Sequence, residues 1–195
     1  MLSKKFTVLD IETSGQLPWK HELVAVGIGG KVLRPDAGRA AVHKLLSKPG
    51  IVVAHTNYDL RWMILDGAPF HPGVDFHDTK VMAFLLDRTQ GILDLDSLAK
   101  RYLGIEGLKK PIRERTIDGE KRIMYDCEEG FGTCPELGLI PIEDVPWPEM
   151  ELYSAQDIDV TADLYVLLRE RLQETDELWA DFVSEERKMS RLLVE

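Results

Sequence analysis

The chain has few of the features that mark secreted, membrane or disulfide-rich proteins. Only two of its 195 residues are cysteines, and no apolar run approaches the roughly 20 residues that a membrane span requires. The N-terminal MLSKK is not followed by an apolar segment and a small-residue cleavage site, so we expect no signal peptide and a cytoplasmic location. Six residues lie between Cys127 and Cys134, a spacing that matches no common zinc or redox motif. In a reducing compartment we expect both to be free thiols.

An excess of positive charge is also missing. The 34 Asp and Glu residues outnumber the 24 Lys and Arg residues and give a formal net charge of −10. Proteins that grip nucleic acid through a broad basic surface draw their affinity from Lys and Arg that neutralise phosphates. Any nucleic-acid function must therefore rest on a local site. Carboxylates that hold divalent cations are one solution, because bound metal ions reverse the sign of the local field.

What is present is the composition and length of a single globular domain, with 44% hydrophobic residues. Apolar runs at 6–11, 23–28 and 31–34, with Gly29-Gly30 between the last two, predict strands joined as a hairpin meander. Further strands are predicted at 51–54 and 74–76. Helices are predicted at 40–47, 59–65, 78–86 and 94–103, the last with Asp94 or Asp96 as its cap and Gly104 as its stop. Strands that are first paired by a hairpin and later separated by helices predict an α/β fold, a mixed sheet with helices on its faces.

Glycine and proline interrupt this alternation from residue 107 to about 150. We expect an irregular insertion there, of the kind that often acts as a functional flap. From Leu152 strong helix formers return and run to Glu195, which predicts two helices with a break near Thr175-Asp176. No stop signal closes the second helix, so we expect a larger protein to continue beyond it.

Two carboxylates stand at the end of a strongly apolar predicted strand, VLDIET at 8–13. The strand period of two puts Asp10 and Glu12 on one face and Leu9 and Ile11 on the other. In so acidic a chain about six acid-x-acid pairs are expected by chance, so the apolar context carries the inference rather than the spacing. A solvated edge strand is the alternative interpretation.

Two more acidic residues stand in comparable positions. Asp59 follows the predicted buried strand 51–54, and Asp157 lies near the start of a predicted helix, with Tyr153 four residues before it on the same face. Each acid taken singly is more often a helix cap or a surface group. Together they suit phosphodiester cleavage, in which two divalent ions about 3.5–4 Å apart activate a water and stabilise the leaving 3′ oxygen.

These residues resemble the motifs of the DEDD exonucleases of the RNase H-like fold, and within them the proofreading domain of family A DNA polymerases and their phage relatives. The first motif is VLDIETSG at 8–15, the second VAHTNYD at 53–59 and the third YSAQDIDVT at 153–161. Asp78-Thr79 and the stretch 95–104 resemble the helices that the family places between the second and third motifs.

The resemblance implies a metal-dependent 3′-to-5′ exonuclease with two Mg²⁺ or Mn²⁺ ions as cofactors. It would hydrolyse single-stranded DNA 3′ ends to nucleoside 5′-monophosphates and proofread during DNA replication. By the resemblance, Asp10, Glu12 and Asp157 hold the tighter ion. Asp10 and Asp59 share the second ion, Asp59 largely through water, and Tyr153 orients the nucleophilic water.

The subclass also follows from the resemblance. Members with a catalytic His carry it five residues before the last Asp, where this chain has Leu152, so the tyrosine (DEDDy) subclass is indicated. The Asn that commonly stands four residues before the second-motif Asp is His55 here, and Asn57 stands two before. We favour His55 slightly as the substrate contact and keep Asn57 as the alternative.

The substrate-binding candidates are Thr13, Leu17, Trp19, His55 and Asn57. Relatives place residues against the last base in the loop that holds Leu17 and Trp19, and an aromatic side chain that stacks on an unpaired base contributes about 1–3 kcal/mol. A core position for Trp19 is the equal alternative. The start of the insertion is basic, which predicts either a flap that steers the strand or a solvated loop; its residues are Lys109, Lys110, Arg113, Arg115, Lys121 and Arg122.

The resulting domain prediction is an exonuclease domain at 1–175, with the insertion at about 107–150, and a C-terminal helix at 176–195 that leads into a polymerase domain. That polymerase domain, in the same or a separate chain, and a single-stranded DNA 3′ end are the expected partners. Two alternatives remain. One is an RNase D-like 3′-to-5′ exoribonuclease, and the other is a non-catalytic module that binds nucleic acid or docks a partner.

Overall fold

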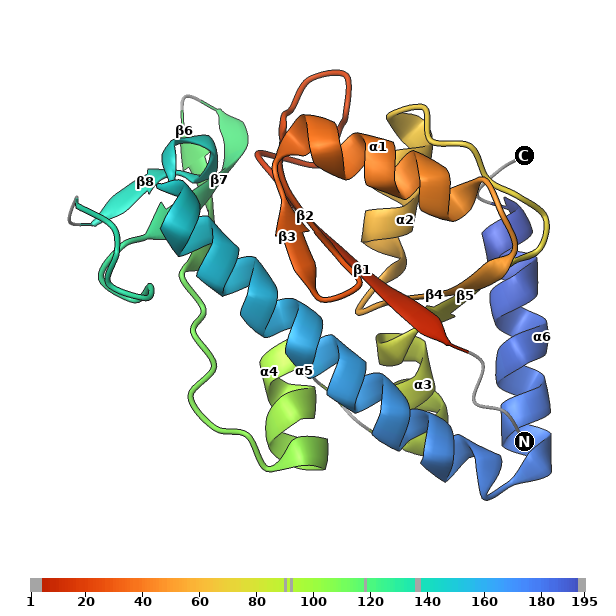
Figure 1. Cartoon of the computed structure of the whole chain (residues 1–195). Coiled ribbons are helices and arrows are strands. Elements are labelled where there is room, and N and C mark those ends of the chain that lie inside the picture. Colours follow the sequence, from red (N-terminus) through yellow and green to blue (C-terminus); the bar gives the residue numbers. More distant parts are fainter. Residues whose placement is uncertain (1–4, 90, 92, 118, 136–137, 193–195) are drawn as a thin grey trace.

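A five-stranded mixed sheet lies at the centre of the fold (Figure 1). In this computed structural model, which describes residues 5–89, 91, 93–117, 119–135 and 138–192, the strand order is β3-β2-β1-β4-β5. The strands are β1 (Phe6–Thr13), β2 (Leu23–Ile28), β3 (Lys31–Leu33), β4 (Gly50–Ala54) and β5 (Val74–Asp78). β1 pairs antiparallel with β2 and parallel with β4, and so lies in the middle of the sheet. The predicted hairpin meander and mixed sheet are confirmed.

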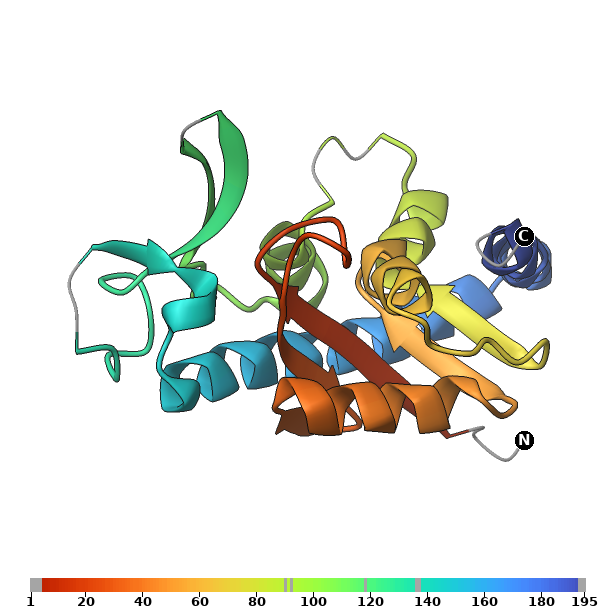
Figure 2. The same ribbon diagram turned by 90° about the horizontal axis from the view of Figure 1, so that it is seen from above.

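Helices cover both faces of this sheet. Figures 1 and 2 show α5 (Trp147–Gln173) along one face and α1 (Pro35–Leu46) on the other, where α2 (Asn57–Leu65) also packs. Leu9 belongs to the apolar core under α1 and α2, whereas its neighbour Val8 belongs to the core under α5. Alternate residues of β1 thus face opposite layers, as a strand period of two requires.

The shorter helices lie where the sequence predicts them. α3 (Thr79–Leu86) follows β5, and α4 (Leu95–Leu98) continues into a π-helical turn at Ala99–Leu103. The Asp94 carboxylate caps α4 by accepting a hydrogen bond from the Ser97 N–H at 2.9 Å. Gly104, at φ 70°, ends the turn in the left-handed conformation that glycine adopts without strain. Asp94 rather than Asp96 is therefore the cap.

Three helices begin earlier than predicted. α2 begins at Asn57 instead of residue 59, and a proline explains each of the two larger shifts. α1 begins at Pro35 instead of residue 40, and α5 begins at Trp147, with Pro148 in its first turn, instead of at Leu152. Proline fits the first turn of a helix because the N–H it lacks would have no intrahelical partner there. α6 (Asp176–Leu192) follows the break at Thr175-Asp176 and packs against β5.

The expectation of an irregular insertion is wrong. A second, antiparallel sheet forms within it, in the order β6 (Ile112–Ile117), β7 (Glu120–Asp126) and β8 (Leu139–Pro141), and projects beside the main sheet (Figure 2). Half of β6 and the first three residues of β7 are exposed, and both strands carry charged residues. The two strands therefore lack the apolar alternation from which strands are predicted.

The expectation of free thiols is also wrong. Cys127, directly after β7, and Cys134 are joined in a disulfide, with their Cα atoms 5.7 Å apart. That separation lies within the range that a disulfide requires. The folding of residues 127–134 into a closed loop brings the two cysteines together, and a search for linear spacing motifs does not detect such a loop.

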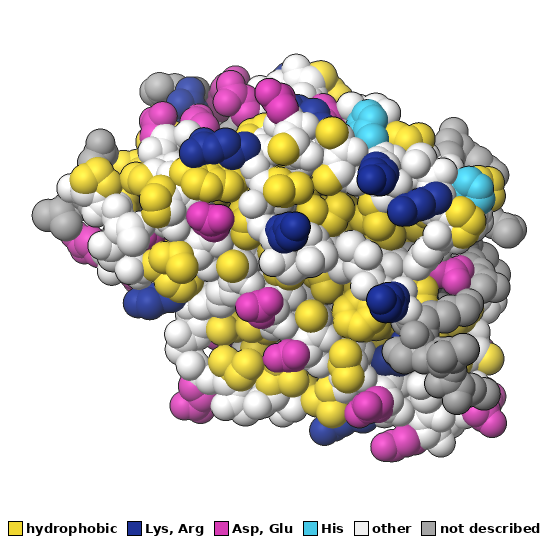
Figure 3. Space-filling model, in the orientation of Figure 1, with side chains coloured by type: hydrophobic (Ala, Val, Ile, Leu, Met, Phe, Trp, Pro, Cys, Tyr) yellow, Lys and Arg dark blue, Asp and Glu magenta, His cyan; other side chains and the backbone are white. Residues whose placement is uncertain are grey.

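The surface carries charges of both signs. On the face seen in Figure 3, Lys and Arg side chains are dispersed among acidic and apolar ones rather than gathered in one basic field. None of the helices in the described residues combines the length and the apolar character that crossing a bilayer demands. On the face shown, a nucleic-acid contact would have to be local, as the net charge indicates.

Candidate active site

Asp10 and Glu12 lie on the face of β1 that α5 covers. Leu9 and Ile11 fill the opposite core, so the strand alternation directs both carboxylates toward α5. Gly27 of β2 pairs with Asp10, and a Cβ at Gly27 would overlap the side chain of Ile158. Glycine at this position lets α5 approach the sheet beside Asp10. The solvated edge strand is excluded, because β1 is central and Glu12 is buried.

Asp59 reaches β1 from the other side of the sheet. The pairing between β1 and β4 ends at Val8 and Val53, so the later residues of β1 have no β4 partner. α2 begins just after β4 and carries Asp59 to this place, where its Oδ1 accepts a hydrogen bond from the Ile11 N–H at 3.1 Å. Thr56 caps α2, so Asp59 is not the cap. Its carboxylate instead accepts the hydrogen bond that a carbonyl of a neighbouring strand would accept from Ile11.

Tyr153 and Asp157 come from α5. Both lie inside this helix rather than at its start, because α5 begins at Trp147. Their spacing of four residues places them on one helix face, where the Tyr153 hydroxyl forms a hydrogen bond with the Asp157 carboxyl group. Tyr153 is buried, and its ring contacts that of Tyr125 edge-on, with ring centres 6.1 Å apart.

The four carboxylates act on one another electrostatically. Burial raises the pKa of Asp10 and of Glu12 well above the ordinary value, and the nearby negative charges raise both further. Burial likewise raises the pKa of Asp59 to about 7, although the Ile11 N–H opposes it, and that of Asp157 to about 6. The fold therefore assembles acidic groups whose repulsion no neighbouring side chain fully cancels, as at sites that bind cations or move protons.

One oxygen of this group has no partner. Asp10 Oδ2 is buried and accepts no hydrogen bond, and such an atom normally has a partner or a special role. Hard carboxylate oxygens of this kind fit Mg²⁺ or Mn²⁺. In the conformation described, no three His, Cys, Asp or Glu side chains of the described residues are grouped so that they could hold a metal ion. The chemistry of the donor set thus fits divalent ions, while a coordination shell is not preformed.

The predicted substrate contacts are spread around the end of β1. Thr13 is buried, and its hydroxyl lies 2.7 Å from the Tyr58 hydroxyl, which donates to the Gly15 carbonyl at 3.1 Å. Leu17 lies in the loop that follows. Trp19 is 66% exposed, so the alternative of a core position is wrong. Leu17 and Trp19 both border a pocket of about 310 Å³ beside α2.

His55 and Asn57 differ in surroundings. His55 is half-buried between β4 and α2, and its Nδ1 lies 3.1 Å from the Thr79 hydroxyl. Burial lowers the pKa of His55 to about 4, with the Lys80 charge adding to the effect, so the ring is neutral at pH 7. Asn57 is the exposed first residue of α2. The preference for His55 over Asn57 as the substrate contact stays a prediction.

The basic segment is largely paired with acids. Three of its six residues form ion pairs, which are Lys110 with Asp94 and Asp96, Arg113 with Glu129, and Lys121 with Glu114. Lys109, Arg115 and Arg122 are exposed. Half of the positive charges predicted for a strand-steering flap are therefore paired with acidic residues of the protein itself.

Three residues near the site were not predicted as site residues. Asp94 and Asp96 border a pocket of about 250 Å³ together with Tyr153 and Asp157. Gln156, beside Asp157, donates through Nε2 to the Asp157 Oδ1 at 3.4 Å. Asp94 and Asp96 were expected only as helix caps, since an Asp before a helix predicts a cap whatever else it faces.

Comparison with known proteins identifies the family. The sequence model of the 3′-5′ exonuclease family matches residues 33–173, which is more than half of the chain. The match contains the second and third motifs and begins after the first. No curated protein matches the sequence.

Solved structures share the fold. NrnC of Brucella melitensis with bound Mg²⁺ has a TM-score of 0.64 at 20% identity, over 97% of this chain and 85% of NrnC. Another NrnC structure is bound to pGG. The catalytic core of RRP6 from Trypanosoma brucei has a TM-score of 0.61 at 13% identity, over 97% of this chain and 46% of that one. The POL domain of Pol1 from M. smegmatis, in complex with DNA primer-template and dNTP, gives 0.54 at 16% identity, over 90% of this chain and 25% of that one.

These matches confirm the predicted α/β, RNase H-like fold, with the β6–β8 sheet as an addition to it. With the fold and the motif resemblance in agreement, the chain belongs to the 3′-5′ exonuclease family, as does the exonuclease domain of family A DNA polymerases.

Proposed function

We propose that this chain is a two-metal-ion exonuclease that hydrolyses the 3′-terminal phosphodiester of single-stranded DNA and releases nucleoside 5′-monophosphates. The observation that carries the proposal is the assembly of Asp10, Glu12, Asp59 and Asp157 from three separate elements, with Asp10 Oδ2 buried and unpartnered. A solvated surface would not collect carboxylates at the cost of their mutual repulsion.

In this proposal Asp10, Glu12 and Asp157 hold one divalent ion, and Asp10 with Asp59 holds the second. Bound Mg²⁺ or Mn²⁺ would supply an activated water and charge stabilisation at the leaving oxygen. Tyr153 lies hydrogen-bonded to Asp157 at the border of the pocket, where its hydroxyl can orient a water. That Mg²⁺ is bound in the NrnC structure supports the choice of ion.

Proofreading is the biological use that the family resemblance supports. A mismatched terminus melts more readily, so it would reach a separate single-strand cleft more often than a paired one. The domain division that we propose is an exonuclease domain at 1–175 and a C-terminal helix at 176–195, of which α6 covers 176–192 and the last three residues lie outside the described residues. We propose a polymerase domain, in this chain or another, as its partner, and the shared fold with Pol1 supports it.

A second candidate is a 3′-to-5′ exoribonuclease of the RNase D type. The likeness to NrnC, one structure of which holds pGG, and to the RRP6 core favours it. Both candidates use the same carboxylates and ions, so they differ only in the sugar that the cleft accepts. A non-catalytic docking module would have no reason to keep the four acids and Tyr153 together.

The test is an exonuclease assay on matched single strands. DNA and RNA of one sequence, labelled at the 5′ end, are incubated with the protein and Mn²⁺, Mg²⁺ or EDTA. We expect shortening from the 3′ end that stops in EDTA and in Asp10→Asn, with DNA degraded faster. Asp163→Asn, an exposed change on α5, is the matched control and should degrade normally. Faster degradation of RNA selects the second candidate. If the parent protein shortens neither strand with Mn²⁺ or with Mg²⁺, nuclease function is rejected.

A further inference from the structure

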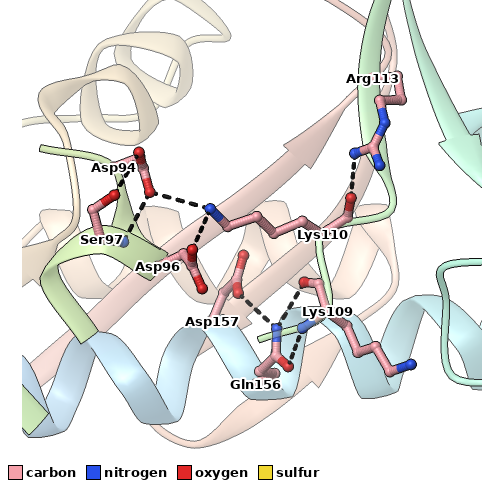
Figure 4. A network of polar contacts seen from close by, with 8 residues as sticks. All are labelled: Asp94, Asp96, Ser97, Lys109, Lys110, Arg113, Gln156 and Asp157. Atoms are coloured by element: carbon pink, nitrogen blue, oxygen red, sulfur yellow. Dashed lines mark hydrogen bonds and ion pairs between the residues drawn. The ribbon is translucent and has the colours of Figure 1, made fainter. Parts of the chain in front are cut away.

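A short segment of the insertion is tied across the side of the site. This segment, residues 108–113, is called the strap below. The Gln156 side chain holds it at both backbone groups of Lys109, accepting from the N–H at 3.0 Å and donating to the carbonyl at 3.1 Å (Figure 4). Gln156 also contacts Asp157, so the strap has a fixed place relative to this carboxylate.

The two lysines of the strap point in different directions. Figure 4 shows the Lys110 side chain extended toward Asp94 and Asp96 and the Lys109 side chain turned away from them. The Lys110 ammonium lies 2.7 Å from Asp96 Oδ2 and 3.3 Å from Asp94 Oδ1. The ammonium is thus paired with two acids, one of which, Asp94, also caps α4.

This ammonium lies beside the proposed metal site. Lys110, Asp94 and Asp96 line the same pocket of about 250 Å³ as Tyr153 and Asp157. The positive charge of Lys110 acts on Asp157 and lowers its pKa, against the larger effect of burial. A cation that is paired with two acids thus lies within electrostatic reach of a carboxylate that we assign to metal binding.

A role in gripping a substrate phosphate fits this arrangement poorly. Two carboxylates already surround the Lys110 ammonium, so Asp94, Lys110 and Asp96 together carry a net charge of −1. An approaching phosphate would be repelled by that sum. A divalent ion near Asp157, in contrast, would meet the repulsion of the ammonium and the attraction of its two partners.

We propose that Lys110 is a resident counter-ion of the carboxylate site, whose charge, balanced by Asp94 and Asp96, sets how tightly the site holds divalent cations. This inference rests on the proposed function, because it assumes that the carboxylates bind metal. In this proposal the strap contributes to metal affinity in addition to the four acids.

The test is calorimetric titration with Mn²⁺ in the absence of nucleic acid. Lys110→Met removes the cation and keeps an apolar stem, and Asp96→Asn removes one of its anions. We expect the dissociation constant to fall about threefold to tenfold in Lys110→Met and to rise by a similar factor in Asp96→Asn. A unit charge about one Debye length from a divalent ion predicts this change when the effective dielectric constant near the protein is about 20–40. Lys109→Met, the same charge change on the neighbour whose side chain is turned away from Asp94 and Asp96, should bind like the parent within about twofold.

The opposite signs separate electrostatics from a structural role. Both variants break the same ion pair, so a purely structural role of that pair would change the dissociation constant in one direction in both. That result, or an unchanged constant in Lys110→Met, overturns the inference. Absence of Mn²⁺ binding in the parent protein would instead reject the proposed function, so the two failures are distinguishable. Urea unfolding in EDTA verifies that each variant folds.

Discussion

Removing one negative charge from the site should stabilise the metal-free protein at neutral pH. Asp59→Asn keeps the shape of the side chain and an oxygen that can accept from the Ile11 N–H. The pKa of Asp59 is about 7 in the fold. In an unfolded chain it is about 3.9. A carboxyl group with a raised pKa favours the folded state fully below about pH 3.9 and loses this contribution as the pH rises through about 7.

The size of the effect follows from that pKa difference. About 3 pKa units at about 1.4 kcal/mol each give a cost of about 4 kcal/mol for ionising Asp59 in the fold at pH 8. Burying an amide in its place has a smaller cost of its own, so we expect a net gain in unfolding free energy of about 3 kcal/mol for Asp59→Asn at pH 8. At pH 4.5 the two proteins should differ by less than about 1 kcal/mol.

The assay is urea unfolding in EDTA at pH 4.5 and pH 8, with Asp163→Asn as the control for a charge removed from the surface. Saturating Mn²⁺ should stabilise the parent protein more than Asp59→Asn, because an ion that binds only the folded state adds its binding free energy to stability. If Asp59→Asn shows the same stability relative to the parent at both pH values, Asp59 is not a repelled buried carboxylate and the electrostatic reasoning is wrong.

Three further changes test other parts of the structure. Gly130→Ala should lower the unfolding free energy by about 1–3 kcal/mol in urea, because the added Cβ would overlap the Glu149 carboxylate; an unchanged value contradicts this packing. Reducing the disulfide between Cys127 and Cys134 should cost about 2 kcal/mol by opening a short loop, measured with and without reductant. Tyr153→Phe keeps the ring but loses the hydroxyl, so kcat should fall about tenfold to a hundredfold while Mn²⁺ affinity stays nearly unchanged; equal loss of both would assign the hydroxyl to metal binding.

The sequence by itself determined the central architecture. The apolar runs that become β1 and β4 are short and continuous, and Asp94 and Gly104 are local cap and stop signals, so these elements follow from nearby residues alone. The placing of Asp10 and Glu12 on one face also follows from a local rule, the strand period of two. The charged hairpin of β6 and β7 has no such local signal, and its strands went unpredicted.

Only the tertiary structure decided which groups meet. The hydrogen bond from Ile11 to Asp59 exists because β4 stops short of the end of β1, and no local pattern encodes where that pairing ends. The closure of Cys127 on Cys134 and the place of Lys110 beside Asp157 likewise depend on the path of the insertion. The physical reason is that propensity and periodicity act over a few residues, whereas the field at a carboxylate is the sum of charges brought near by the whole chain.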